Sequence, residues 1–323
     1  MKDSLETRCG NFIAAQKIIA NAEPLQSRFI YPVCAELFLE HGVVPDPDKL
    51  KECDHLIIKE AGIFSDFGGL GALIIISHLS MSPNPKKHFD ELEAARKVLR
   101  EEFPPLSDYL PIAAVILSET EDRKEWKKIA RKAKKLYDEL RKKHILLSSG
   151  GDMVYAVILA RSVEDTDEIV KKAEECYNIL KQKKYDALST LSLSRVLALK
   201  PGTAEENCKR VTALYNALNL KGAKYGKEYQ LPVLGLAAML PDSTEEIASE
   251  ILKADKILSK QKQYKGIIPT YSSSVRLMHA AMIVSGNESV KSEIKADMTA
   301  AVHQNMFIAM QIALWSLLAT LFI

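Results

Sequence analysis

One sequence pattern recurs about every forty residues between roughly residues 70 and 290, and this recurrence constrains the fold more than any other feature of the chain. Each copy combines a short, mostly apolar segment with a longer amphipathic one. Four leucines of the long segments repeat at spacings of 38 to 40 residues: Leu140, Leu180, Leu218 and Leu258. Six apolar residues of the short segments repeat at 40 to 44 residues: Ile75, Leu117, Leu159, Leu199, Met239 and Ile283. Two columns with one period predict an array of stacked helix pairs, because helix-pair solenoids have repeats of this length.

The long segments have the spacing of amphipathic helices. In one of them, six apolar residues fall on a single helix face: Trp126, Ile129, Ala133, Leu136, Tyr137 and Leu140. The short segments, such as 153–160, are apolar nearly all round, so we expect them to be inner helices packed between neighbours. A single helix pair cannot bury its apolar stripe alone. Since burying one apolar side chain contributes about 1.5 to 3 kcal/mol, we expect successive pairs to stack.

Helix boundaries and composition agree with this interpretation. Thr203, and Ser243 or Thr244, precede acidic first turns, where N-caps and carboxylates satisfy free backbone amides and the helix dipole. The chain has fourteen Gly and thirteen Pro, which is too few to favour a turn-rich all-β protein. We therefore predict an all-α protein whose αα-hairpin repeats form either a solenoid or a closed helical toroid.

The chain outside the repeats predicts two further parts. Helical patterns occupy about 4–21, 25–41 and 47–61 before the array begins. After the array, one more helix is expected. We divide the chain into three predicted parts: an N-terminal helical cap over 1–69, the helix-pair repeat array over 70–290, and an apolar C-terminal helix over 291–323.

Charge and cysteine content identify no partner class and no metal. The 44 Lys and Arg nearly balance the 42 Asp and Glu, which leaves a net charge of +2. The five cysteines are far apart and have neither CxxC nor Cys/His spacing of the kind found in zinc sites. The N-terminus carries acids and no unbroken apolar run, which disfavours a secretory signal. We expect a cytoplasmic protein with reduced thiols, without a metal or a cofactor.

Three polar pairs on the predicted inner helices are the strongest candidate site. They occupy matching positions, four and seven residues before the aligned apolar residue, with i, i+3 spacing: Asp152 and Tyr155, Ser192 and Arg195, Arg276 and His279. If equivalent faces converged on a concave surface, Arg195 and Arg276 would bind a carboxylate or phosphate, and Tyr155 and His279 would orient it. The alternative, which we favour, is that these groups make caps and internal hydrogen bonds between repeats.

The segment 122–144 is the most basic part of the chain, with eleven Lys and Arg against four acids. Its basic face could contact RNA or an anionic membrane. The sequence favours a solvated outer face balanced by acids elsewhere, because no nucleic-acid motif accompanies the basic residues. We therefore do not expect a nucleic-acid partner.

The last eighteen residues, Met306–Ile323, are predominantly apolar and have the length of a marginal membrane span. One alternative is therefore a membrane-associated protein held by this segment. The other is a final helix that fills the array or closes an oligomer. We favour burial within the protein.

Several stretches resemble a known family. They are AGIF at 61–64, RKKHILLSSGGDMVYAVILA at 141–160 and LSTLSLSRVLAL at 188–199. Together they look like the bacterial domain-of-unknown-function family 4003. The resemblance implies a helical fold and carries over no catalytic residues.

Three functional hypotheses follow. The leading one is a non-catalytic module that binds a protein partner or assembles with itself, since no Ser/His/Asp set or carboxylate pair can be assigned from composition alone. The second is a small anionic-ligand binder or an enzyme with its site around Arg195, Arg276 and His279. The third is membrane association through Met306–Ile323.

Overall fold

The described part of the chain is helical throughout. The computed structural model describes residues 4–62, 65–68, 71–104, 107, 109–119, 122–147, 150–161, 165–266 and 269–286. Over these residues the chain forms fourteen α-helices and four short 3-10 turns, and no β-strand. The prediction of an all-α protein is confirmed.

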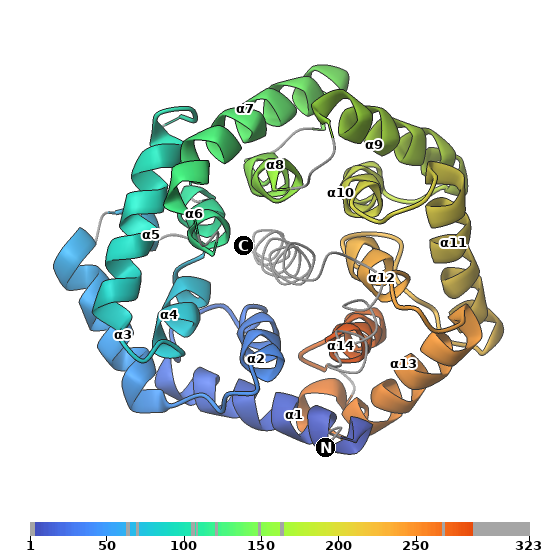
Figure 1. Cartoon of the computed structure of the whole chain (residues 1–323). Coiled ribbons are helices and arrows are strands. Elements are labelled where there is room, and N and C mark those ends of the chain that lie inside the picture. The colour runs from blue at the N-terminus through green and yellow to red at the C-terminus, as the bar shows by residue number, and fades with distance from the viewer. Residues whose placement is uncertain are drawn as a thin grey trace. The chain divides into compact units, whose positions relative to one another are not determined.

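The helices alternate between short and long from α2 onward (Figure 1). Their bounds are α1 (Leu5–Ala22), α2 (Tyr31–Glu40), α3 (Pro47–Ala61), α4 (Ala72–Ser80), α5 (Pro85–Arg100), α6 (Leu110–Ser118), α7 (Trp126–Lys143), α8 (Asp152–Ala160), α9 (Thr166–Leu180), α10 (Ala187–Ala198), α11 (Ala204–Leu220), α12 (Leu231–Ala237), α13 (Thr244–Leu258) and α14 (Ser273–Ser285). The 3-10 turns are η1 (Asp66–Gly68), η2 (Arg123–Glu125), η3 (Lys181–Lys183) and η4 (Lys262–Tyr264).

The second helix begins later than its sequence pattern predicts. The pattern starts near residue 25, whereas α2 starts at Tyr31. The hydroxyl of Tyr31 donates hydrogen bonds to the carbonyl oxygens of Glu23 and Gln26, at 2.8 and 2.9 Å, and so holds the preceding residues in a turn.

The chain divides into two compact units. One unit is Ile13–Thr166, which we call the α2–α8 unit. The other contains the residues before Ile13 and the described residues from Asp167 onward, which we call the α9–α14 unit. The proposed division into cap, array and C-terminal helix stays a prediction, and residues 291–323 lie outside the described residues.

Short and long helices form two rows in the α2–α8 unit (Figure 1). The short helices α4, α6 and α8 pack on one another in chain order, and the long helices α3, α5 and α7 do the same. Each long helix also packs on the short helix that follows it. Every residue of α8 is buried, whereas α7 buries one stripe: Trp126, Ile129, Ala130, Ala133, Leu136, Tyr137 and Leu140. The spacing of the stripe therefore sets which side of α7 faces the protein.

The α9–α14 unit has similar helix contacts. The short helix α12 packs on α10 and α14, the long helix α11 packs on α13, and α13 packs on α14. Thr203 and Ser243 each begin a long helix with a capping box, in which the hydroxyl accepts a hydrogen bond from the amide of Glu206 or Glu246. Of the two alternatives at the start of α13, Ser243 is the N-cap. These caps satisfy amides that the helix itself leaves without partners.

In the part of the chain that the structure describes, no helix has the length and apolarity required to cross a membrane. Met306–Ile323, the segment on which the membrane hypothesis depends, lies outside that part.

Candidate functional site

Arg276, a predicted anion-binding residue, makes an ion pair within its own unit. It lies on α14, and its guanidinium donates from Nε and Nη2 to the two carboxylate oxygens of Asp255 on α13, at 2.7 and 3.1 Å. The two side chains are 19% and 17% exposed. This bidentate pair joins neighbouring helices, which is the internal role that we favoured for the polar pairs.

His279, the partner of Arg276 in the same predicted pair, lies in an aromatic cluster. Its Nδ1 is 2.7 Å from the hydroxyl of Tyr264, and its ring packs against the rings of Phe12, Tyr264 and Tyr271. Burial lowers the pKa of His279 to about 3, so its imidazole is neutral at physiological pH. A neutral, enclosed imidazole is poorly suited to orient an anion.

The other predicted site residues lie on two short helices. Asp152 and Tyr155 are buried on α8, in the α2–α8 unit. On α10, in the α9–α14 unit, Arg195 is buried and Ser192 is partly exposed. Each pair shares a helix as its spacing predicts, and convergence of the three pairs on one site stays a prediction.

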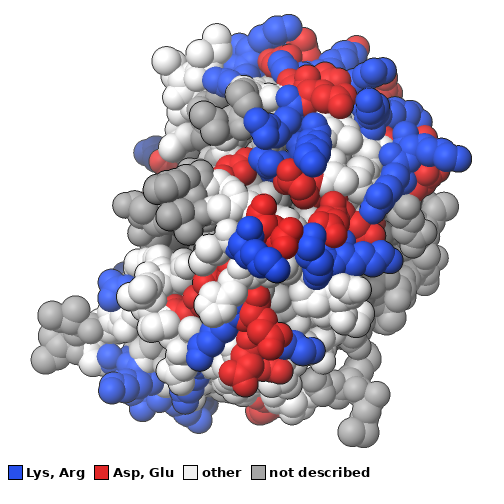
Figure 2. All heavy atoms as spheres, turned by 90° about the vertical axis from the view of Figure 1, so that its left-hand side faces the viewer, with Lys and Arg blue, Asp and Glu red and all other residues white. Residues whose placement is uncertain are grey.

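The basic segment predicted at 122–144 forms η2 and α7, and several of its cations are paired with acids. Lys127 and Arg131 reach Glu101 and Glu102 just after α5, at 3.4 and 3.6 Å. Further pairs lie within α7, such as Lys134 with Asp138 at 2.5 Å. We call the side of the α2–α8 unit formed by α3, α5 and α7 the long-helix face. Figure 2 shows positive and negative side chains interspersed on the side of the molecule that carries α3 and α5.

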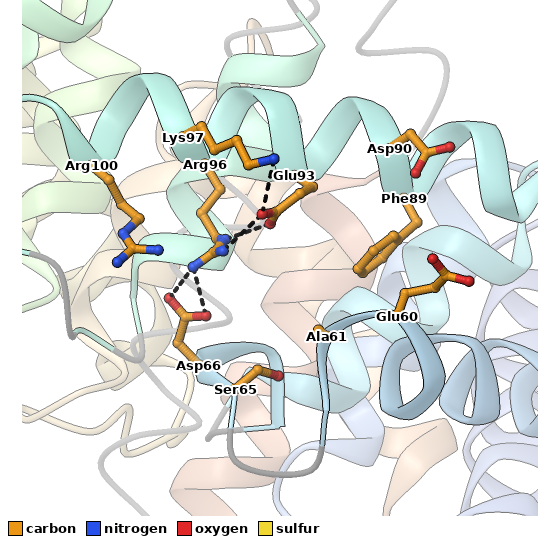
Figure 3. A pocket seen from close by; sticks show the side chains of 10 residues that line it. All are labelled: Glu60, Ala61, Ser65, Asp66, Phe89, Asp90, Glu93, Arg96, Lys97 and Arg100. Carbon is orange, nitrogen blue, oxygen red and sulfur yellow. Dashed lines mark hydrogen bonds and ion pairs between the residues drawn. The ribbon is translucent and has the colours of Figure 1, made fainter.

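A pocket opens on the long-helix face between the end of α3, η1 and α5 (Figure 3). Its volume is ≈ 470 Å³, within the range of ligand-binding clefts. Ten residues line it: Glu60, Ala61, Ser65, Asp66, Phe89, Asp90, Glu93, Arg96, Lys97 and Arg100. Most are charged or polar, unlike the largely apolar walls of typical small-molecule sites.

Arg96 forms the centre of the pocket. Its Nη1 donates to both carboxylate oxygens of Asp66 at 3.0 Å, and its Nε and Nη2 donate to Glu93 at 2.7 and 2.9 Å. The guanidinium carbon lies 5.2 Å from the ring centre of Phe67. The hydrogen bonds to Glu93, together with the two nearby carboxylates, raise the pKa of Arg96. All three nitrogens are engaged, so Arg96 fixes the pocket floor by tying η1 to α5.

The two ends of the pocket differ in charge (Figure 3). At one end, Lys86 bridges the carboxylates of Glu60 and Asp90, at 3.2 and 2.5 Å. At the other end lie Lys97 and Arg100. Lys97 is 70% exposed and 3.7 Å from Glu93, and Arg100 has no hydrogen bond or ion pair with the described residues. Arg100 is therefore a cation available to a binding partner.

Ser65 adds one further polar group to the pocket. Its hydroxyl oxygen is buried and has no hydrogen-bond partner among the described residues. Leaving a buried hydroxyl without a partner is unfavourable, so a group that reached it from the pocket would gain a hydrogen bond.

The pocket places charged groups of both signs next to one another. Across the described residues, no group of three or more His, Cys, Asp or Glu side chains could hold a metal ion. The pocket lining contains no His or Cys, and its one hydroxyl nucleophile, Ser65, has no base hydrogen bonded to it. Nucleophilic catalysis by a serine requires such a base.

Comparison with known proteins identifies the family. A family model with the description "Protein of unknown function (DUF4003)" matches residues 23–313. The chain belongs to the DUF4003 family. The resemblance predicted from the stretches around residues 61–64, 141–160 and 188–199 is therefore confirmed. No curated protein and no solved structure matches the chain.

Sequence reasoning missed the pocket of this DUF4003 protein. Glu93, Arg96, Lys97 and Arg100 share one side of α5 by their spacing, which an amphipathic pattern can reveal. Asp66 contacts Arg96 from 30 residues away, across a loop whose path the sequence pattern does not define. A run of charges at i, i+3 and i+4 was the only signal available, and many solvated helices have it.

Proposed function

We propose that this DUF4003 protein is a non-catalytic helical-repeat module that binds another protein chain through its long-helix face. The repeat is supported by the packing order within each unit, where helices two apart in the chain lie against each other. Each such helix has an apolar side that only a neighbour can bury. An array of this kind presents an extended surface for binding.

The observation that carries the proposal is Arg100, which lies at one end of a polar pocket on this face and has no ion-pair partner among the described residues. Arginine is enriched among residues that dominate protein–protein binding, because its planar guanidinium can hold a carboxylate with two hydrogen bonds. We expect an acidic side chain of the partner to bind Arg100. The mixed charges around the pocket fit a polar interface rim rather than an enclosed small-molecule site.

The second hypothesis, a small anionic ligand held by Arg195, Arg276 and His279, has less support. Arg276 already binds Asp255, and His279 already binds Tyr264. A ligand would have to displace both interactions before gaining its own.

Site-specific photo-crosslinking tests the proposal. A benzoyl-phenylalanine replaces Lys97, at the pocket, in full-length protein, and irradiation follows in cell extract of the source organism. We expect a discrete crosslinked product that is lost in the Arg100→Glu variant and weakened by added salt, since salt screens exposed charges over about 8 Å at physiological ionic strength. The mass of the product distinguishes a second copy of this chain from a different protein.

The matched control places the same crosslinker at Lys253, which is 63% exposed on α13 of the α9–α14 unit and outside the pocket. Equal crosslinking from both positions, or a product unaffected by Arg100→Glu, would contradict binding at the pocket. Circular dichroism of each variant checks that the helices are intact.

A further inference from the structure

Two cysteines lie together in the α9–α14 unit. Cys176 is on α9 and Cys208 is on α11. The thiol of Cys208 donates a hydrogen bond to the backbone carbonyl oxygen of Cys176, with the sulfur 3.7 Å from that oxygen. Both are free thiols with buried side chains. Two cysteines 32 positions apart in the chain are thus in direct contact.

The surroundings of Cys176 favour its thiolate. The neighbouring thiol of Cys208 is the largest influence and lowers the pKa of Cys176, and the ammonium of Lys172 acts in the same direction. Burial and the carboxylates of Glu175 and Glu205 oppose this shift without cancelling it. The neighbouring thiol of Cys176 and burial raise the pKa of Cys208. One partner is therefore set up as the nucleophile and the other as the thiol that reacts with it afterwards.

Small reagents have a route to this pair. Cys208 lines a surface pocket of ≈ 410 Å³, together with Lys209 and Thr212 of the same helix. A molecule the size of hydrogen peroxide can therefore enter this pocket and reach the wall formed by Cys208, next to Cys176.

Two other cysteines provide an internal comparison. Burial raises the pKa of Cys34 to about 12 and that of Cys53 to about 11, so both remain protonated and unreactive at neutral pH. Neither lines a described pocket.

We propose that Cys176 and Cys208 form an oxidation site at which hydrogen peroxide produces a disulfide between α9 and α11. The Cys176 thiolate attacks one peroxide oxygen, the O–O bond breaks, and Cys176 becomes a sulfenic acid while hydroxide leaves. The sulfur of Cys208 then attacks the sulfenic sulfur, and the hydroxyl leaves as water with the Cys208 proton. In total, two thiols lose two electrons and two protons, and one peroxide is reduced to two waters. A thiol-based reductant reverses the bond by exchange.

Peptide mass spectrometry tests the site. Folded full-length protein is treated with hydrogen peroxide, remaining thiols are alkylated, and the digest is searched for linked peptides. We expect the Cys176–Cys208 peptide, two hydrogen atoms lighter than its parts, as the main oxidised product, with Cys34 and Cys53 still alkylated. The link should disappear on reduction with dithiothreitol.

Two variants separate the proposal from simple thiol exposure. Cys208→Ser should abolish the link and leave Cys176 oxidised to sulfinic acid, whereas Cys34→Ser should form the link as the wild type does. The proposal is overturned if the folded protein oxidises Cys34 or Cys53 first. It is also overturned if the link forms only in urea, where all cysteines are exposed, or if Cys34→Ser loses it.

Discussion

The ion pair between Arg276 and Asp255 allows a quantitative test of whether Arg276 contributes to stability. Its two charge-assisted hydrogen bonds, at 2.7 and 3.1 Å, lie at side chains that are 19% and 17% exposed. Removing one partner of a fully buried pair costs about 3 to 5 kcal/mol, and exposed pairs contribute about 0.2 to 1 kcal/mol. Because this pair is mostly but not wholly buried, we expect a coupling free energy of about 2 kcal/mol.

A double-mutant cycle measures that coupling. Arg276→Ala, Asp255→Ala and the double variant are unfolded in urea and followed by circular dichroism, and the coupling is the part of the destabilisation that is not additive. The matched control is Lys253 with Glu250, 2.6 Å apart on α13 and 63% and 44% exposed. Because both of its side chains are largely in water, that pair should show a clearly smaller coupling than Arg276 and Asp255. If the coupling at Arg276 were no larger than in the control, Arg276 would contribute little to stability and the anion-binding hypothesis would regain support.

Three further outcomes follow from burial and packing. The folded pKa of His279, about 3, lies below its ordinary value of 6.5, so its contribution to stability is fully present above pH 6.5 and is lost as pH falls towards 3. Between pH 6.5 and 5, the free energy of unfolding measured in urea should therefore fall by about 2 kcal/mol less in His279→Gln than in the wild type. The same fall in both proteins would contradict this. Leu140→Ala, at a side chain that is 2% exposed, should lower the free energy of unfolding by about 2 to 5 kcal/mol, whereas Leu146→Ala, at 97% exposure, should hardly change it. Equal effects would show that the buried side of α7 is assigned wrongly. Gly235→Ala would set a Cβ 2.5 Å from Leu193 of α10, so thermal unfolding should show destabilisation by about 1 to 3 kcal/mol, and a more stable variant would refute that close approach.

The spacing of apolar residues predicted the helices well because it depends only on residues within the same helix. The stripe ending at Leu140 fixes which side of α7 is buried, whatever packs against it. Thr203 and Ser243 cap their helices through residues three positions away, so the capping interactions are also local. The start of α2 was placed too early because Tyr31 binds carbonyls in the preceding turn, a contact that apolar spacing does not encode.

The polar pairs show that residue spacing does not predict contacts between different helices. The spacing of Arg276 and His279 correctly places both on one helix, but their roles depend on Asp255 and Tyr264, which lie 21 and 15 residues earlier. A periodic pattern predicts the side of the helix on which a residue lies, but not the residue that it contacts on another helix. Matching positions in a repeat can therefore hold internal hydrogen bonds as readily as ligand contacts.

Arg96 and Arg100 make the same point within one helix. They are four residues apart, so they lie one turn apart on the same side of α5 and are equivalent in any helical pattern. Arg96 is bound by Asp66 because η1 places this carboxylate within hydrogen-bond distance of it, and Glu93 lies one turn earlier on α5. Arg100 lies one turn further along α5 and lacks a carboxylate partner among the described residues. Whether an arginine of α5 serves the fold or is exposed for binding thus depends on the position of the Asp66 carboxylate. The Arg100→Glu variant changes the exposed arginine and leaves the hydrogen bonds of Arg96 in place.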